Sequence, residues 1–277
     1  MKDRRWIRFR RNKGALLGAA VVAVVVVAAV AADWIAPFDP ESRAGRPRVP
    51  PGDVHWFGTD DVGFDVFSRV VHGARLSLIT ALSSVGIAFA VGVPLGLLAG
   101  WYRRVDGIVM RAVDVMLAFP SILLAVAIAG IFEARSLTNV IVAVGIVMVP
   151  IFIRQVRAAT LQVKSLEYVA AARALGASDA RILFRTVLPN CIAPILVLTT
   201  LNLGIAILDA AGLGFLGLGA PPGSPEWGLM LTNGMEYVVH DLQWMLLPPG
   251  LAISLTVLGF NLLGDGLRDA FDPRHTR

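Results

Sequence analysis

Few residues in this chain of 277 have the types and spacing that enzyme chemistry requires. A phosphate-binding P-loop needs Gly-Lys followed by Ser or Thr, yet none of the three lysines, Lys2, Lys13 and Lys164, follows a glycine. Binding of ATP through that motif is therefore excluded. A metal centre built from clustered thiols is excluded too, because Cys191 is the single cysteine.

Hydrolase chemistry finds equally little support. The His-Glu-x-x-His spacing of zinc proteases does not occur. The four histidines are scattered along the chain: His55, His72, His240 and His275. No Gly-x-Ser-x-Gly nucleophile elbow is present. Ser83-Ser84, within a long apolar run, is the one candidate for an intramembrane serine site, although small polar residues there also suit close helix packing. We therefore predict no catalytic and no metal-binding residue.

The sequence predicts that membrane helices hold any functional residues in place. Apolar residues make up 56% of the chain, charged residues 16%, and the mean hydropathy is +0.70. Backbone groups in lipid need internal hydrogen bonds, and runs this long and uniformly apolar favour helices over a barrel. Six charge-free runs predict an all-α protein with six transmembrane helices: 14–32, 76–102, 115–132, 136–153, 186–208 and 242–264.

The charges between these runs predict the orientation. With the N-terminus inside, nineteen Lys and Arg fall on the inner side and six on the outer side. The positive-inside rule then places both termini in the cytoplasm. The net charge of +5 is accordingly explained by the excess of Lys and Arg on the inner side and by contact with anionic membrane lipid. We expect no nucleic-acid partner. The first run also resembles a signal peptide, but it exceeds the usual length, so we expect it to be retained.

One stretch between two apolar runs is soluble in character: Glu167 to Asn190, EYVAAARALGASDARILFRTVLPN. Ser165 is predicted to cap a short helix that Gly176 ends in a left-handed turn. Ser178 is predicted to cap a second helix leading to Pro189. Isolated helices this short are marginal in water. The pair must therefore pack on a partner protein or on its own bundle, and composition leaves both open.

This stretch resembles the cytoplasmic coupling loop of bacterial ABC importer permeases. The family pattern is Glu-Ala-Ala, three residues, Gly, nine residues, Ile, one residue, Leu-Pro. The matching positions here are Ala171, Ala172, Gly176, Leu188 and Pro189. Ala170 stands in place of the usual Glu, and Thr186 in place of Ile. The resemblance implies that this loop, with Glu167 and Arg173 in its first helix, contacts an ATPase, and that helix shape and the Gly176 turn matter more than charge.

Further segments resemble the C-type permease subunit of the dipeptide, oligopeptide and nickel group. They include Ala36-Pro37-Phe38-Asp39-Pro40, Phe57-Gly58-Thr59-Asp60, Asp65 to Arg69, Gly73 to Leu78, and Asn261 to Asp265. Phe64 departs from the pattern, since an Arg is common there. The resemblance covers nearly the whole chain and implies the type I ABC importer permease fold.

A glycine-rich segment follows the fifth apolar run and also resembles this group. Four glycines within eight residues make a poor helix but allow irregular backbone and close contact between helices. We predict either a gate at the outer mouth or a purely packing role. The candidate residues that face the gate or a binding protein are Asp209, Gly212, Gly214, Gly217, Gly219, Glu226 and Trp227.

The implied function is that of a non-catalytic permease subunit in the bacterial inner membrane, importing dipeptides or oligopeptides by alternating access. The expected partners are a second homologous permease, two ABC ATPases that hold ATP and Mg, and an extracytoplasmic substrate-binding protein, with no cofactor in this chain. Nickel or another small solute is the alternative cargo; an intramembrane enzyme or a signalling receptor is the alternative class.

The predicted organisation is a basic N-terminus 1–13, a first helix 14–35, an outer loop 36–75, a permease core 76–265 with the coupling loop 154–186, and a tail 266–277.

Overall fold

The computed structural model describes residues 8–132, 135–235, 237 and 242–271. Parts of the predicted N-terminus and tail, together with His240 and His275, lie outside these residues. The described regular elements are helical, with one isolated bridge between Thr59 and Asp65. The helices are α2 (Lys13–Val30), α3 (Ala32–Ile35), α4 (Val66–Trp101), α5 (Arg103–Leu117), α6 (Ser121–Ala129), α7 (Leu137–Lys164), α8 (Glu167–Ala174), α9 (Asp179–Ile182), a π-helix (Leu183–Val187), α10 (Leu188–Phe215), α11 (Trp227–Met235), a 3₁₀ turn (Gln243–Met245) and α12 (Leu247–Phe271).

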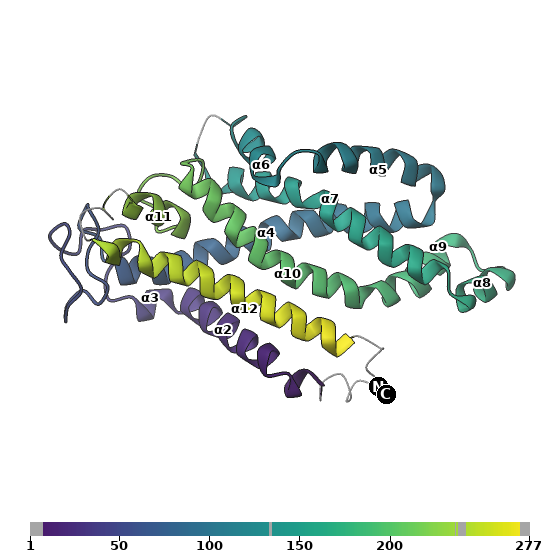
Figure 1. The fold of residues 1–277 in the computed structure, drawn as a ribbon, viewed down its shortest axis with the longest axis horizontal. Coiled ribbons are helices and arrows are strands. Elements are labelled where there is room, and N and C mark those ends of the chain that lie inside the picture. The colour runs from purple at the N-terminus through teal and green to yellow at the C-terminus, as the bar shows by residue number, and fades with distance from the viewer. Residues whose placement is uncertain (1–7, 133–134, 236, 238–241, 272–277) are drawn as a thin grey trace.

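The long helices form one elongated bundle (Figure 1). We call the end with residues 36–65 and α11 the loop end, and the end with α8 and α9 the coupling end. Five described helical stretches are long and apolar enough to cross a membrane. They contain α2, α4, α7, α10 and α12 and agree with five of the six predicted runs, although α4 begins ten residues before the apolar run that predicts it.

The third predicted span, 115–132, is not one straight helix. The structure ends α5 at Leu117 and starts α6 at Ser121, with a bend of 91° between them. Pro120 explains the break, because proline disfavours helical geometry in the residue before it and lacks a backbone N–H. The bundle therefore has six crossings only if this bent pair is counted as one.

The tightest helix pair is α4 with α7, and glycines at every fourth position of α4 make it possible. Gly92, Gly96 and Gly100 form a stripe on one face. A Cβ on Gly96 would lie 2.8 Å from the Cβ of Val156, and one on Gly100 would lie 2.6 Å from that of Thr160. Such distances leave no room for a side chain. The two helices therefore pack as one unit through the middle of the bundle.

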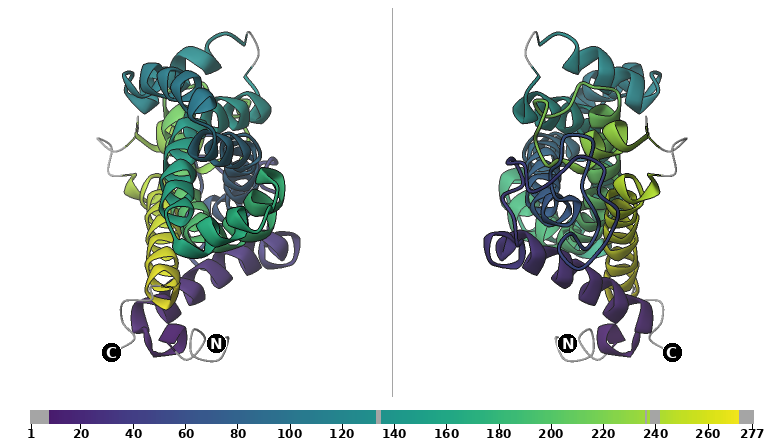
Figure 2. Two further views of the ribbon diagram at one scale, coloured as in Figure 1. Left: turned by 90° about the vertical axis from the view of Figure 1, so that its right-hand side faces the viewer. Right: turned by 90° about the vertical axis from the view of Figure 1, so that its left-hand side faces the viewer.

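Helix α2 lies at the periphery and packs chiefly against α12 (Figure 2). A Cβ on Gly18 would lie 2.6 Å from the backbone N of Leu263, so this contact also depends on glycine. At the coupling end, Asn12 Nδ2 donates to Asp269 Oδ2 at 3.0 Å. The start of α2 and the end of α12 are thus joined.

The loop end is organised around one buried cation. Arg69 on α4 is 2% exposed and donates to the carbonyl oxygens of Pro40 and Ser224, at 3.1 and 3.0 Å. Its Nε lies 3.8 Å from the Asp60 carboxylate. That carboxylate also accepts hydrogen bonds from the backbone N–H groups of residues 62–64. Because a buried charge needs such partners, Arg69 fixes two loops distant in sequence to the same helix.

Candidate coupling loop and loop-end site

The turn after α8 has the hydrogen bonds of a Schellman motif. Gly176 N donates to Arg173 O at 3.0 Å, and Ala177 N donates to Ala172 O at 3.1 Å. Gly176 has a φ of +81°, which L-residues with a Cβ rarely adopt. The predicted left-handed stop at Gly176 is therefore confirmed, and it sets the angle between α8 and α9.

The two predicted caps have different outcomes. Ser178 Oγ accepts from Arg181 N at 3.4 Å, so it caps α9 as predicted. The prediction for Ser165 is wrong. Ser165 ends α7, and its hydroxyl donates to Gln162 O, while α8 starts after Leu166 without a side-chain cap. The α7 C-terminus has carbonyls to satisfy, and Ser165 bonds one of them instead of the N–H groups of α8.

The coupling loop is anchored by a few apolar side chains and exposes the others. Val169 and Ile182 are buried in the main core. Ala171, which matches the family pattern, and Ala170, which replaces its Glu, are exposed, whereas Ala172 is half-buried. Leu175, beside the Gly176 turn, is 88% exposed. Contact of this exposed surface with another protein stays a prediction.

A single tryptophan joins this loop to the bundle. Trp101, buried at the end of α4, has the Arg173 guanidinium carbon 5.1 Å and Lys164 Nζ 5.2 Å from its ring centroid. Lys164 Nζ also donates to Trp101 O at 2.6 Å, which satisfies a terminal carbonyl of α4. Arg173 extends the contact to α9, since its Nη2 lies 3.5 Å from Asp179 Oδ1. Both short helices are therefore tied to the α4–α7 unit.

The chain enters α10 through a π-helical segment, Leu183–Val187. Leu188 and Pro189 follow as the first residues of α10, where the missing N–H of proline costs nothing. Single π-helical turns inside helices are frequently found at functional sites. The second helix of the loop is thus continuous with a membrane span.

At the loop end, the glycine-rich segment packs backbone against backbone. A Cβ on Gly214 would lie 2.5 Å from Glu226 Oε2, and one on Gly219 would lie 2.6 Å from Gly214 Cα. Gly217 has a φ of +76° and ends α10, and Gly212 faces Ile122 of α6. The packing role is thus directly visible for these glycines, whereas a gate role stays a prediction.

Glu226 and Trp227 position α11 below this segment. Glu226 is buried, and its two carboxylate oxygens accept from the N–H groups of Gly228 and Leu229, both at 2.8 Å. Burial raises the pKa of Glu226, and these two hydrogen bonds partly oppose the shift. Trp227 Nε1 donates to Val70 O at 2.9 Å and so fixes α11 to α4.

Asp209 lies inside α10, six residues before its last residue, and is half-buried. Among the described residues, none gives its carboxylate a hydrogen bond or an ion pair. Ile205 and Leu208, on neighbouring turns, are exposed. An acid inside a membrane helix usually indicates a functional position. Its contact with a gate or binding protein stays a prediction.

Comparison with known proteins places this geometry in a family. A model described as the binding-protein-dependent transport system inner membrane component matches residues 92–277. The chain belongs to this permease family. A second model, the N-terminal transmembrane domain of oligopeptide transport permease C, matches residues 3–51. The permease is thus a multi-pass protein of the bacterial inner membrane, and its resemblance to C-type subunits is confirmed.

Curated relatives resemble the permease over nearly its full length. The di/tripeptide transport system permease protein DppC of Pseudomonas aeruginosa is 46% identical over 97% of the permease and 91% of that protein. The dipeptide transport system permease protein DppC of Alkalihalophilus pseudofirmus is 45% identical over 96% and 88%. The glutathione transport system permease protein GsiD of Pectobacterium atrosepticum is 44% identical over 97% and 90%.

A solved structure confirms the predicted fold. A chain of the inward-facing MetNI methionine ABC transporter aligns with a TM-score of 0.59 at 22% identity, over 74% of the permease and 98% of that chain. At this identity the likeness concerns the fold alone.

The residues that hold the coupling loop in place were not predicted from the sequence. Trp101 and Lys164 lie at the ends of helices predicted only as apolar runs. Lys164 contacts the ring of Trp101 and donates to its backbone carbonyl, and neither partner carries a local sequence signal. Leu175 had a detectable signal, because it is a large apolar residue beside a turn glycine in a soluble insert.

Proposed function

We propose that the permease is the C-type membrane subunit of a bacterial ABC importer for dipeptides and oligopeptides. The observation that carries the proposal is the similarity of 44–46% identity, over nearly the whole chain, to permeases named for dipeptide, di/tripeptide and glutathione transport. All three names describe peptides. The type I importer fold supports the same class of transporter.

In this proposal the coupling end faces the cytoplasm and the loop end faces outward. The excess of Lys and Arg on the coupling side supports that orientation. The transporter would contain two ATPase subunits. One of them would contact the exposed surface of α8, including Glu167 and Ala170 to Arg173. A second, homologous permease would complete the pathway, and a substrate-binding protein would dock at the loop end, with Asp209 and the 212–219 segment near the gate. ATP and Mg would be held by the ATPases.

The structure suggests how motion would pass through this subunit. Closure of the ATPases would displace α8, and the Arg173–Trp101 and Arg173–Asp179 contacts would carry the displacement to α4 and α9. Because α4 and α7 are packed without space between them, they would respond as one body. The pathway would thereby alternate between inward-facing and outward-facing states, and peptide released outside would leave inward after hydrolysis.

A matched pair of glycine substitutions tests the coupling role. Gly176→Pro and Gly223→Pro both put proline at a position with positive φ, +81° and +92°, and open space around it. Only Gly176 lies in the coupling loop. We expect Gly176→Pro to lower dipeptide uptake and substrate-stimulated ATP hydrolysis of the assembled complex at least tenfold. The control Gly223→Pro disturbs the loop end instead and should lower the ATPase stimulation less than Gly176→Pro does. Unchanged uptake and hydrolysis in Gly176→Pro would remove the coupling role.

The cargo is tested separately by competition. Uptake of a labelled dipeptide in cells with the complete transporter should be inhibited by unlabelled dipeptides and tripeptides, and not by nickel ions. Inhibition by nickel alone would favour the small-solute alternative.

A further inference from the structure

Helix α2 is attached to the bundle at two separated places. In its coupling-end half, Gly18 and α12 are in backbone contact, and a Cβ on Gly259 would lie 2.9 Å from Val21 Cγ1. At its loop end, Arg75 of α4 donates from Nε to Ala29 O at 2.9 Å and pairs with Asp33 at 2.9 Å. Between these two attachments Val22 and Val25 pack against the core, and an open gap lies beside them.

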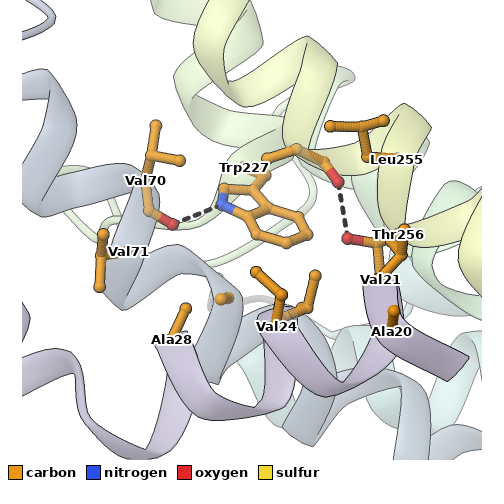
Figure 3. Close-up of a pocket in the computed structure, with 12 residues that line it drawn as sticks. Ala20, Val21, Val24, Ala28, Val70, Val71, Trp227, Leu255 and Thr256 are labelled. Atoms are coloured by element: carbon orange, nitrogen blue, oxygen red, sulfur yellow. Dashed lines mark hydrogen bonds between the residues drawn. The ribbon is translucent and has the colours of Figure 1, made fainter. Parts of the chain in front are cut away.

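The gap is a cavity of about 330 Å³ between α2, α4, α11 and α12 (Figure 3). Its walls are formed by alanines and valines of α2 and α4, with Trp227 from α11 and Leu255 from α12. The polar side-chain groups in the wall already have partners. Trp227 Nε1 donates to Val70 O, and Thr256 Oγ1 donates to Ala252 O at 2.6 Å. Water in the cavity would find almost no hydrogen-bond partner, and apolar cavities of this kind stay dry.

The cavity opens sideways, toward the surroundings of the bundle. Val24 and Leu255, which line it, are 68% and 50% exposed. In α2 only 17% of the residues of the apolar window are buried, against 50% in α4 and in α7. An apolar opening beside the apolar part of α2 is suited to contact with the hydrocarbon of the membrane.

We infer that one acyl chain of a membrane phospholipid occupies this cavity. At about 30 Å³ for a water-sized group, the volume holds roughly ten such groups, which corresponds to an acyl segment of similar length in methylenes. A single turn of a partner helix, about 10 Å across and about 5.4 Å high, would need more than this volume. A peptide would lose the hydrogen bonds of its backbone there, which is unfavourable. The acyl chain fills the gap that the two attachments of α2 leave and stabilises α2 against the core.

Photolabelling of the assembled transporter tests this site. The complex is placed in phosphatidylcholine nanodiscs that contain phosphatidylcholine with a diazirine near the middle of one acyl chain. After irradiation, labelled residues are identified by mass spectrometry. Trp227 is the reporter, because it is 2% exposed and lines the cavity. Val26 and Val27, exposed on α2 and outside the cavity wall, report contact with ordinary surrounding lipid.

We expect labelling of Trp227 as well as of Val26 and Val27. Ala28→Leu, which fills the cavity, and Val24→Phe, which blocks its exposed rim, should each lower Trp227 labelling at least fivefold. Ala23→Leu on the exposed face of the same helix should leave it unchanged. Labelling of Val26 and Val27 should persist in all variants and thereby shows that α2 is in the membrane.

Absence of label on Trp227 in the unsubstituted complex, with Val26 and Val27 labelled, would overturn the inference. Equal Trp227 labelling in the two cavity variants and in Ala23→Leu would also overturn it. Because Val24→Phe alters only an exposed position, a folding defect in Ala28→Leu does not remove the test.

Discussion

The guanidinium of Arg173 lies over the ring of Trp101, with 5.1 Å between the guanidinium carbon and the ring centroid. Arg173 belongs to the exposed helix α8, and Trp101 is the last residue of α4. This contact is therefore a direct link between the surface that we propose meets an ATPase and the interior of the membrane bundle. Lys164 approaches the same ring and holds the α4 carbonyls, so the link includes α7.

Replacing Arg173 should weaken coupling more than folding. Cation–π contacts at exposed sites contribute about 0.5–1 kcal/mol, so Arg173→Ala should change the unfolding midpoint little. We expect it to lower substrate-stimulated ATP hydrolysis and peptide uptake several-fold. Arg181→Ala is the control, since Arg181 lies exposed on α9 and is not among the described residues that contact the Trp101 ring. Equal losses in the two variants would show that charge on the loop, and not the Trp101 contact, is what matters.

Two glycines of α4 should respond oppositely to the same substitution. Gly96→Ala places a Cβ 2.8 Å from Val156 and should destabilise the chain by about 1–3 kcal/mol through overpacking. Gly86→Ala meets nothing within 4 Å and should stabilise it by about 0.5–1 kcal/mol. Thermal unfolding of the purified permease in detergent measures both. A neutral Gly96→Ala would mean that α4 and α7 have room to separate.

Loss of the buried cation should release the loop end. Arg69→Met would orphan the carbonyls of Pro40 and Ser224 and leave Asp60 without its ion pair, at a cost of about 3–5 kcal/mol. We expect proteinase K to cut within 36–65 at least tenfold faster in this variant. Arg104→Met, at an exposed position of α5, should leave the cleavage rate unchanged. Similar rates in both variants would show that the loops hold their positions without Arg69.

Glu226 should make the stability of the permease depend on pH. Its pKa in the folded state is raised above the ordinary value of 4.5 by burial. Just above pH 4.5 the folded chain therefore holds a proton that the unfolded chain has released. The contribution of Glu226 to stability is present below this window and is lost as pH rises through the folded-state pKa.

Unfolding midpoints measured from pH 4 to 8 test this sign. The midpoint of the unsubstituted permease should fall with rising pH more steeply than that of Glu226→Gln, which has no proton to release. Asp60, whose pKa burial also raises, contributes equally to both curves and cancels in the comparison. Parallel curves, or a steeper fall in the variant, would contradict the assignment.

The spans and the Gly176 turn were predictable because each depends on local sequence. A long apolar run must form a helix in lipid. A glycine such as Gly176 at the end of a short helix favours a left-handed turn that stops the helix. The bend at Pro120 has a local cause as well. It was not predicted because the residues on both sides of Pro120 are apolar and together resemble one continuous span. The early start of α4 was hidden by Arg69, His72 and Arg75, which look like loop charges until their partners are known.

The contacts that position the candidate sites could not be predicted. Trp101, Arg69 and Glu226 each bind groups that are distant in sequence or belong to the backbone, and a single sequence contains no record of such pairings. The Ser165 prediction failed for a related reason. A serine between two helices can serve the end of one or the start of the other, and local sequence does not distinguish these outcomes.

The pairing of α2 with α12 has a consequence for how the protein is made. Among the described membrane helices α2 comes first in the chain, and its principal partner α12 comes last. During synthesis α2 must remain in the bilayer without that partner until more than two hundred residues have followed it. Its long run of valines and alanines forms a helix that is stable in lipid without a partner helix. The contact between α2 and α12 can therefore form only late in synthesis, after α4 and α7 have both been made.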